Sequence, residues 1–160
     1  WNMYPGWYDD DLSLEDLDRR FEASLKGIRK WLDENGQEKP FFVTEFGAGA
    51  ILGQSTFDSG RRWTENYQEK LLDKTINAII NSEVVEGFYI WQFCDTRTAL
   101  PSKTSIGRPR NFNNKGLVDE HRKPKYAYHA VKKLLHKIPT YTGYKPSLNE
   151  VVTEKTNENI

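Results

Sequence analysis

The feature that most constrains this chain is a short apolar run, FFVTEF at residues 41–46, between Pro40 and Gly47. It lacks the strict polar alternation of a half-exposed strand, so it is typical of a strand that is buried on both faces of a parallel sheet. A second run of this kind, VVEGFYIWQF, occupies residues 84–93. The two runs predict an α/β protein built on a parallel sheet.

Helical patterns lie before, between and after these strands. Apolar residues recur at steps of three or four from Ser13, the expected N-cap, to Gly36, where the helix should stop. A second helix is expected near residues 64–81. A third should run from Pro124, which suits a first helical turn, to Ile138. Strands and helices therefore alternate along the chain.

This alternation is that of successive βα units. Residues 1–4 could add a short strand, and residues 94–120 have the composition of a long polar loop. About three such units make less than half of an eight-fold barrel, which typically needs about 250 residues. The predicted fold is α/β, with residues 1–138 forming about three βα units of a TIM (β/α)8 barrel that is incomplete on its own. Residues 139–160 should form a polar tail.

Composition argues against several kinds of partner and site. Lys plus Arg and Asp plus Glu both number 23, so no overall field favours nucleic acid or an anionic membrane. No run approaches the roughly 20 apolar residues that span a bilayer. The single cysteine, Cys94, forms no internal disulfide and is compatible with a cytoplasmic location. No His or Cys cluster predicts a metal site, and His121 and His129 are expected at the surface.

Polar residues gather where the predicted strands end, which is where (β/α) barrels carry their functional side chains. They occur at residues 4–8, at residues 44–47 and from Trp91 into the following basic loop. Glu45 stands out, because an ionisable group in an apolar strand is costly to bury without partners. It is either a structural carboxylate, paired with an arginine or capping a backbone amide, or a nucleophile or acid–base residue.

Several motifs resemble one enzyme family in their order and spacing. GWY, FVTEFG, FYIWQF, NNKG and RKPK follow one another, from residue 6 to residue 125. In this order they resemble the end of the catalytic barrel of glycoside hydrolase family 2, and within it the β-glucuronidases. The resemblance implies retaining hydrolysis of β-D-glucuronides with release of D-glucuronic acid. In that mechanism one carboxylate attacks the sugar, and a second, about 5 Å away, acts as acid and base.

The resemblance also implies roles for single residues. Glu45 matches the nucleophile, and it must be ionised to attack. Tyr4 and Tyr8 match tyrosines of the sugar pocket and are candidate hydrogen-bond donors near Glu45, with Asn2 a weaker candidate. Trp91 matches a tryptophan that walls the pocket, although an ordinary core aromatic is the alternative.

Recognition of the sugar carboxylate is implied by a short motif after the last strand. Asn113 and Lys115 match the Asn-x-Lys pair that binds the C6 carboxylate in β-glucuronidases. An ammonium and an amide can form charge-assisted hydrogen bonds to a carboxylate. The alternative is a surface turn with an exposed lysine. Of the nearby arginines, Arg108 and Arg110, we select Arg110 as a further contact to the carboxylate.

The acid–base glutamate of the family has no counterpart in this chain. We therefore expect the isolated chain to be inactive and to need the N-terminal part of the same protein as its partner. The other expected partner is a β-glucuronide, either a small molecule or a glycan, with no cofactor; homo-oligomer formation stays open. Two alternatives remain: a related family 2 enzyme acting on a galacturonide or a neutral sugar such as a galactoside, and a non-catalytic carbohydrate-binding or assembly fragment.

Overall fold

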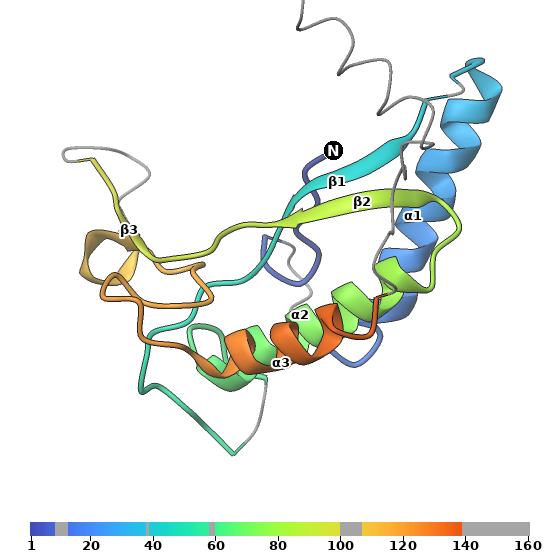
Figure 1. Ribbon diagram of the computed structural model, residues 1–160. Coiled ribbons are helices and arrows are strands. Elements are labelled where there is room, and N and C mark those ends of the chain that lie inside the picture. The colour runs from blue at the N-terminus through green and yellow to red at the C-terminus, as the bar shows by residue number, and fades with distance from the viewer. Residues whose placement is uncertain (9–12, 38, 58–59, 100–106, 139–160) are drawn as a thin grey trace, which may run out of the picture.

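The computed structural model describes residues 1–8, 13–37, 39–57, 60–99 and 107–138. In Figure 1 the two longer strands, β1 and β2, run side by side, with α2 and α3 together on one side of them and α1 at one end. The elements are α1 (Leu17–Glu34), β1 (Phe41–Phe46), α2 (Glu65–Ile80), β2 (Val85–Ile90), β3 (Thr96–Arg97), a 3-10 turn (Pro109–Asn111), β4 (Phe112–Asn113) and α3 (Tyr126–Leu135).

Strands β1 and β2 pair in parallel with α2 between them in sequence, as predicted. The strand expected at residues 1–4 is reduced to one parallel bridge between Asn2 and Glu45, with the Met3 N–H donating to the Glu45 carbonyl at 2.7 Å. Strand β2 ends at Ile90 instead of residue 93, because the Gln92 N–H donates to the Lys115 carbonyl and no longer faces β1. Three extended segments thus lie in parallel.

The expectation that β1 is buried on both faces is wrong for this chain. Phe41, Val43 and Phe46 are buried against the helices, whereas Phe42 and Thr44 on the other face are exposed. A closed barrel would cover that second face with other strands. The exposed face is therefore where a chain with so few strands departs from a complete barrel.

The structure corrects two of the predicted helix starts and one of the predicted helix ends. Helix α1 begins at Leu17 with Asp16 as N-cap, because the Ser13 hydroxyl accepts from the Glu15 N–H before the helix starts. Helix α2 has the predicted bounds, with the Thr64 side chain accepting from the Tyr67 N–H. The predicted stop at Gly36 is confirmed by its positive φ of 63°.

Helix α3 begins at Tyr126, two residues after the predicted first turn at Pro124, and ends at Leu135, three residues before the predicted end at Ile138. Pro124 pairs with Val118 in an antiparallel bridge, and the Lys125 N–H donates to the Leu117 carbonyl at 3.0 Å. Lys125 is therefore the extended N-cap of α3, with φ −91° and ψ 170°. Its place between a bridge and a helix matters for the site.

The segment predicted as one long loop contains short structure. Strands β3 and β4 pair antiparallel within it, although residues 100–106 lie outside the described part. The predicted tail at residues 139–160 also lies outside it. His121 and His129 are exposed, as expected. Among the described residues, no helix combines the length and the apolar composition required to cross a membrane.

Candidate active site

A β-bulge sets the direction of Glu45. Val43 pairs with Phe88 and Phe46 with Ile90, so β1 uses one residue more than β2 over the same stretch. Such an extra residue interrupts the alternation of a strand and re-aims a side chain, often beside an active site. Glu45 is consequently only partly buried, between the buried Val43 and Phe46.

Tyr4 is the hydrogen-bond partner of Glu45. Its hydroxyl donates to Glu45 Oε2 at 2.7 Å, across a separation of 41 residues. Burial, and after it the hydrogen bond to Glu45, raise the pKa of Tyr4 far above its ordinary value, so the phenol keeps its proton and remains a donor. No Lys or Arg of the described residues lies within ion-pair distance of Glu45, so the alternative of a structural ion pair finds no support there.

Lys115 lies beside the same tyrosine. Its side chain is buried, and Nζ donates to the Tyr8 hydroxyl at 3.0 Å and lies 5.7 Å from the centre of the Tyr4 ring. The rings of Trp7 and Tyr8 are each 5.0 Å from Nζ. Such rings stabilise a cation that has left water. Burial nonetheless lowers the pKa of Lys115 below its ordinary value.

The arrangement corrects the expectation for Tyr8, which contacts the cation and not the carboxylate. Lys115 has no carboxylate within ion-pair distance among the described residues, although it is an ammonium in a ring of aromatic side chains. Within the described part of the chain, no carboxylate therefore neutralises the charge of Lys115. Glu45 and Lys115 are linked through Tyr4, which places a carboxylate and a cation at one site.

A pocket of about 360 Å³ opens at Lys115. This volume is within the usual range for small-molecule sites. Among the residues that the structure describes, its wall combines aromatic rings with cations and contains no acidic side chain: Trp7, Tyr8, Arg62, Trp63, Gly107, Arg108 and Lys115. The lining suits an anionic ligand with a flat, partly apolar body.

The choice of Arg110 as a carboxylate contact does not fit the geometry. Its guanidinium is bound to Glu120, at 2.7 Å and 3.3 Å, and lies over the Phe112 ring. Arg108, in contrast, lines the pocket with Lys115, and its charge adds to the lowering of the Lys115 pKa that burial causes. Of the two arginines considered from the sequence, Arg108 is therefore the one that lines the pocket.

Exchanging each arginine for methionine should separate these two positions. Arg108→Met should raise the KM for an anionic substrate about tenfold or more, since one charged hydrogen bond contributes about 1.5–3 kcal/mol. Arg110→Met should leave KM unchanged and cost about 1 kcal/mol of stability, because its ion pair is partly exposed. Steady-state kinetics and thermal unfolding of both variants provide the check, and a larger KM effect for Arg110→Met would contradict the assignment.

The remaining predicted residues surround this centre. The Asn113 side chain is buried and its Oδ1 accepts from the Lys115 N–H at 3.3 Å. Asn2 Oδ1 accepts from the Thr44 hydroxyl at 2.8 Å and does not bond the Glu45 carboxylate. Trp91 is 40% exposed in this part of the barrel and lies just beyond β2.

Close packing explains the glycine after β1. A Cβ on Gly47 would lie 2.3 Å from the Trp91 carbonyl oxygen, and its φ of 154° is one that other residues rarely adopt. Gly47 therefore lets the chain leave β1 directly against Trp91. This brings the loop after β1 next to the loop after β2, at the end where Glu45 lies.

Sequence reasoning missed the buried polar residues behind the site. Asp95, Lys125, Gln68 and Asn114 are all buried and join the loops that follow β1 and β2. The position of Asp95 soon after β2 could have indicated its role, because polar residues gather where the predicted strands end. Among the described residues, no group of three or more His, Cys, Asp and Glu side chains could hold a metal ion.

Comparison with known proteins decides the family. Residues 1–140 match the family described as Glycosyl hydrolases family 2, TIM barrel domain. The chain belongs to glycoside hydrolase family 2. It is 36% identical over 126 residues to a β-glucuronidase of Paenibacillus borealis, which covers 79% of this chain. The predicted barrel fragment is thus confirmed as part of a family 2 TIM barrel domain.

Solved structures of family 2 enzymes have the same fold. A β-galacturonidase from Eisenbergiella tayi, bound to galacturonate, is 39% identical and covers 88% of this chain with a TM-score of 0.75. A β-D-glucuronidase of Dictyoglomus thermophilum is 30% identical and covers 86% with a TM-score of 0.71. The chain spans only 19% of the Paenibacillus relative and 23% and 22% of these two structures.

Proposed function

We propose that this chain takes part in the retaining hydrolysis of β-D-glucuronides, supplying the nucleophile Glu45 and the site for the sugar carboxylate. One observation carries the proposal: Tyr4 bonds Glu45 through its hydroxyl and faces the Lys115 ammonium with its ring. A uronide needs both groups at neighbouring positions, a nucleophile at C1 and a cation at the C6 carboxylate. Residues 1–138 would supply about three βα units at the C-terminal end of the barrel.

The first chemical step falls to Glu45. Its carboxylate attacks the anomeric carbon, the bond from that carbon to the aglycone oxygen breaks, and a glycosyl ester forms on Glu45. The departing oxygen takes a proton from a second carboxylic acid, which then removes a proton from the water that cleaves the ester. The Tyr4 hydroxyl holds one oxygen of Glu45, which leaves the other free to attack.

The sugar carboxylate would be bound by Lys115 with Asn113 and Arg108. The ammonium is already desolvated and is surrounded by the rings of Tyr4, Trp7 and Tyr8. A hexose without the carboxylate would leave this buried cation unpaired, which is costly. Trp91, exposed beside the site, would form a wall for the sugar ring.

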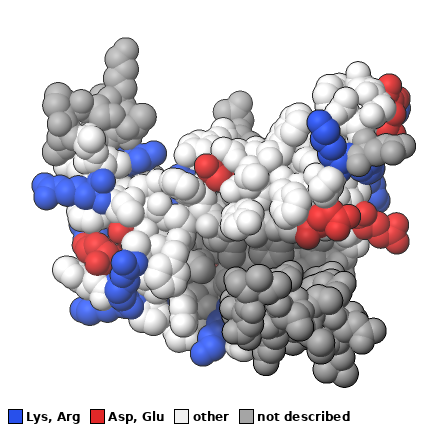
Figure 2. Space-filling view, turned by 45° about the horizontal axis from the view of Figure 1, so that its top comes forward, with Lys and Arg blue, Asp and Glu red and all other residues white. Residues whose placement is uncertain are grey.

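The second carboxylic acid would come from another part of the protein, and the exposed face of the sheet suggests where that part packs. Large aromatic side chains are exposed on the strands or in the segments next to them: Trp1, Phe42, Tyr89, Trp91 and Phe93. Figure 2 shows one face of the molecule whose middle carries few charges, while Lys, Arg, Asp and Glu gather toward the two sides. We propose that the preceding part of the same barrel covers the strands here and brings the acid–base residue.

A galacturonide is the second candidate substrate. It is favoured by the 39% identity to the Eisenbergiella tayi β-galacturonidase, a higher identity than that to the glucuronidases compared above. Glucuronides and galacturonides share the C6 carboxylate and differ only in the orientation of the C4 hydroxyl. Lys115 and Arg108 therefore serve both equally, and the choice depends on contacts at C4.

A substrate comparison tests the function. It uses the complete enzyme, meaning residues 1–160 together with the polypeptide that supplies the rest of the barrel. We expect aryl β-D-glucuronide to be hydrolysed with a kcat/KM at least about 100-fold above that of the β-D-galactoside and β-D-glucoside. Preference for the β-D-galacturonide would select the second candidate, preference for a neutral sugar would discard the carboxylate site, and no turnover would favour a binding fragment.

A further inference from the structure

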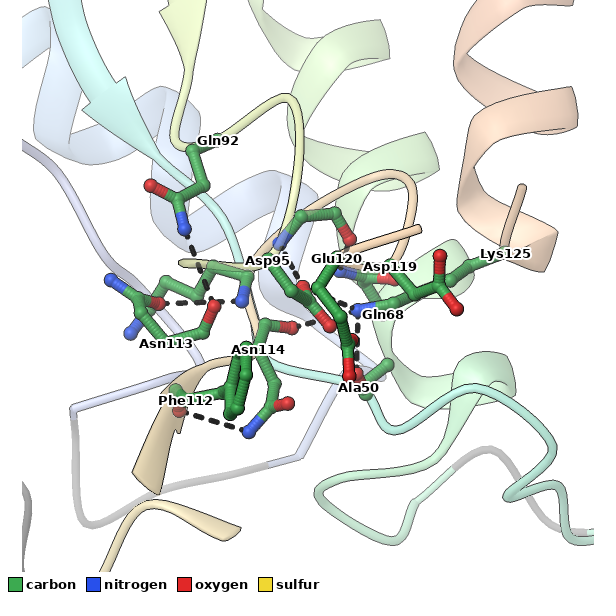
Figure 3. A network of polar contacts seen from close by, with 12 residues as sticks. Ala50, Gln68, Gln92, Asp95, Phe112, Asn113, Asn114, Asp119, Glu120 and Lys125 are labelled. Carbon is green, nitrogen blue, oxygen red and sulfur yellow. Dashed lines mark hydrogen bonds and ion pairs between the residues drawn. The ribbon is translucent and has the colours of Figure 1, made fainter. Parts of the chain in front are cut away.

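We propose that the buried ion pair of Asp95 and Lys125 positions Lys115 for recognition of the substrate carboxylate. The proposal rests on the uronidase function above and extends it to two residues that touch neither the pocket nor Glu45. Figure 3 shows Lys125 reaching from the start of α3 to Asp95 and Ala50 in the loops after the strands. The two side chains are fully buried.

Lys125 joins three segments at a single atom. Its Nζ donates to the Ala50 carbonyl at 2.6 Å, to Asp95 Oδ1 at 2.8 Å and to the Asn114 carbonyl at 3.1 Å. An ammonium has three donors, so all of them are used. The loop after β1, the loop after β2 and the segment that carries Lys115 are thereby held to the N-terminus of α3.

Asp95 completes the grip on the Lys115 segment. Its Oδ1 accepts from the Gly116 N–H at 2.8 Å, while Lys125 holds the carbonyl of Asn114. The residues immediately before and after Lys115 are therefore both bound by the same ion pair. The backbone of Lys115 has little freedom to shift relative to the pocket.

Gly116 fits this grip only because it has no side chain. A Cβ at this position would lie 2.3 Å from both the Asp95 nitrogen and the Val118 carbonyl oxygen. The Gln68 side chain, on α2, also donates to the Gly116 carbonyl at 3.0 Å and to the Ala48 carbonyl at 2.9 Å. The backbone at Gly116 is thus packed against Asp95, Val118 and Gln68.

Stability alone does not account for a pair of this kind. Burial raises the pKa of Asp95 and lowers that of Lys125, so removal from water opposes both charges. Buried ion pairs can often be replaced by apolar residues without loss of stability. What an apolar pair cannot replace is the set of directed hydrogen bonds to Ala50, Asn114 and Gly116. We therefore assign the pair a positioning role.

The test is the double variant Asp95→Asn/Lys125→Met in the complete enzyme. It removes both charges together, so neither is left buried alone, and it keeps an acceptor oxygen for the Gly116 N–H. The matched control is Asp18→Asn/Lys74→Met, which removes a Lys–Asp pair of 3.2 Å that links α1 and α2. KM and kcat are measured for an aryl β-D-glucuronide and the matching β-D-galactoside, with thermal unfolding to confirm the fold.

We expect the double variant to raise the KM of the glucuronide about tenfold or more, with the galactoside changed less than twofold and the control unchanged on both. Equal losses on both substrates would show a merely structural role and overturn the proposal. If the double variant does not fold, Asp95→Glu, which keeps both charges but displaces the acceptor of the Gly116 N–H, decides in the same way, with an expected change of about threefold. Failure of the function itself would appear separately, as a wild-type enzyme without preference for the glucuronide.

Discussion

Replacing Glu45 by Gln should reduce the kcat of the complete enzyme on an aryl β-D-glucuronide by about 10⁴-fold or more. The amide has nearly the shape of the carboxylate but cannot form the glycosyl ester. The fold should survive, because the hydrogen bond that the Tyr4 hydroxyl donates to this side chain can also be made to an amide oxygen. Activity assays together with circular dichroism provide the measurement.

A control variant on the neighbouring strand separates the loss of the nucleophile from the loss of one negative charge. Glu86 lies on β2 and is exposed, so Glu86→Gln should keep activity within about twofold. Comparable losses for the two variants, or substantial turnover by Glu45→Gln, would remove Glu45 from the role of nucleophile.

The chemistry of a truncated variant gives a second check on Glu45. In Glu45→Ala, azide can occupy the vacated space and attack the anomeric carbon of an activated aryl glucuronide, expelling the phenolate. Attack from the side of the lost carboxylate yields the α-glucuronyl azide. Formation of the β-azide, or no rescue at any azide concentration, would contradict the assignment.

The second large effect is expected at Lys115. Lys115→Met keeps the unbranched stem among the rings of Tyr4, Trp7 and Tyr8 but removes the charge. We expect the preference for glucuronide over galactoside, measured as the ratio of kcat/KM, to fall about 100-fold. This corresponds to about 3 kcal/mol for a charge-assisted hydrogen bond in a buried site.

The loss should lie on the glucuronide. Turnover of the galactoside should stay the same or rise, because the variant no longer has an unpaired ammonium facing a neutral hydroxymethyl group. The matched control is Lys123, which is exposed and directly precedes Pro124 of the bridge to Val118. Lys123→Met should leave the kcat/KM of both substrates unchanged. A parallel loss on both substrates would mean that Lys115 supports the fold and not the carboxylate.

The same lysine predicts a pH dependence of specificity. Burial lowers the pKa of Lys115 below its ordinary value of 10.5. Below the folded-state pKa the amine is charged and can pair with the substrate carboxylate, and above it the charge is lost. Preference for the glucuronide should therefore decline as pH rises toward 10.5, while hydrolysis of the galactoside lacks this transition. Ratios of kcat/KM across alkaline pH would show it, and a ratio independent of pH would contradict it.

The sequence predicted the fold best where the interactions that decide it lie between neighbouring residues in the chain. The 3.6-residue period predicted α2 within one residue of its bounds in the structure, and the apolar run predicted β1. Glycine after α1 and the apolar run of β1 act through neighbours in the chain, so their effect can be read without knowing the fold. The starts of α1 and α3 were missed because competing hydrogen bonds, to Ser13 and Leu117, delay the helix.

Some residues of the candidate site could likewise be predicted from the sequence, and others could not. Glu45, Tyr4, Asn113, Lys115 and Trp91 were named from motifs, and the structure brings the first two and Lys115 together. The choice between Arg108 and Arg110 could not be made from spacing, because residues two apart in a loop can face different neighbours. Arg110 finds Glu120, whereas Arg108 lines the pocket.

The sequence by itself predicted the parallel βα arrangement and the gathering of polar residues at the strand ends, and its resemblance to family 2 implied the residues for a uronide. Only the tertiary structure decided that a bulge turns Glu45 out of the core, that Tyr8 serves Lys115, and that Asp95 and Lys125 hold the lysine segment. The physical reason is distance along the chain. Periodicity acts over a few residues, whereas the bond from Lys115 to Tyr8 spans 107 residues and exists only once packing has brought both ends to one place.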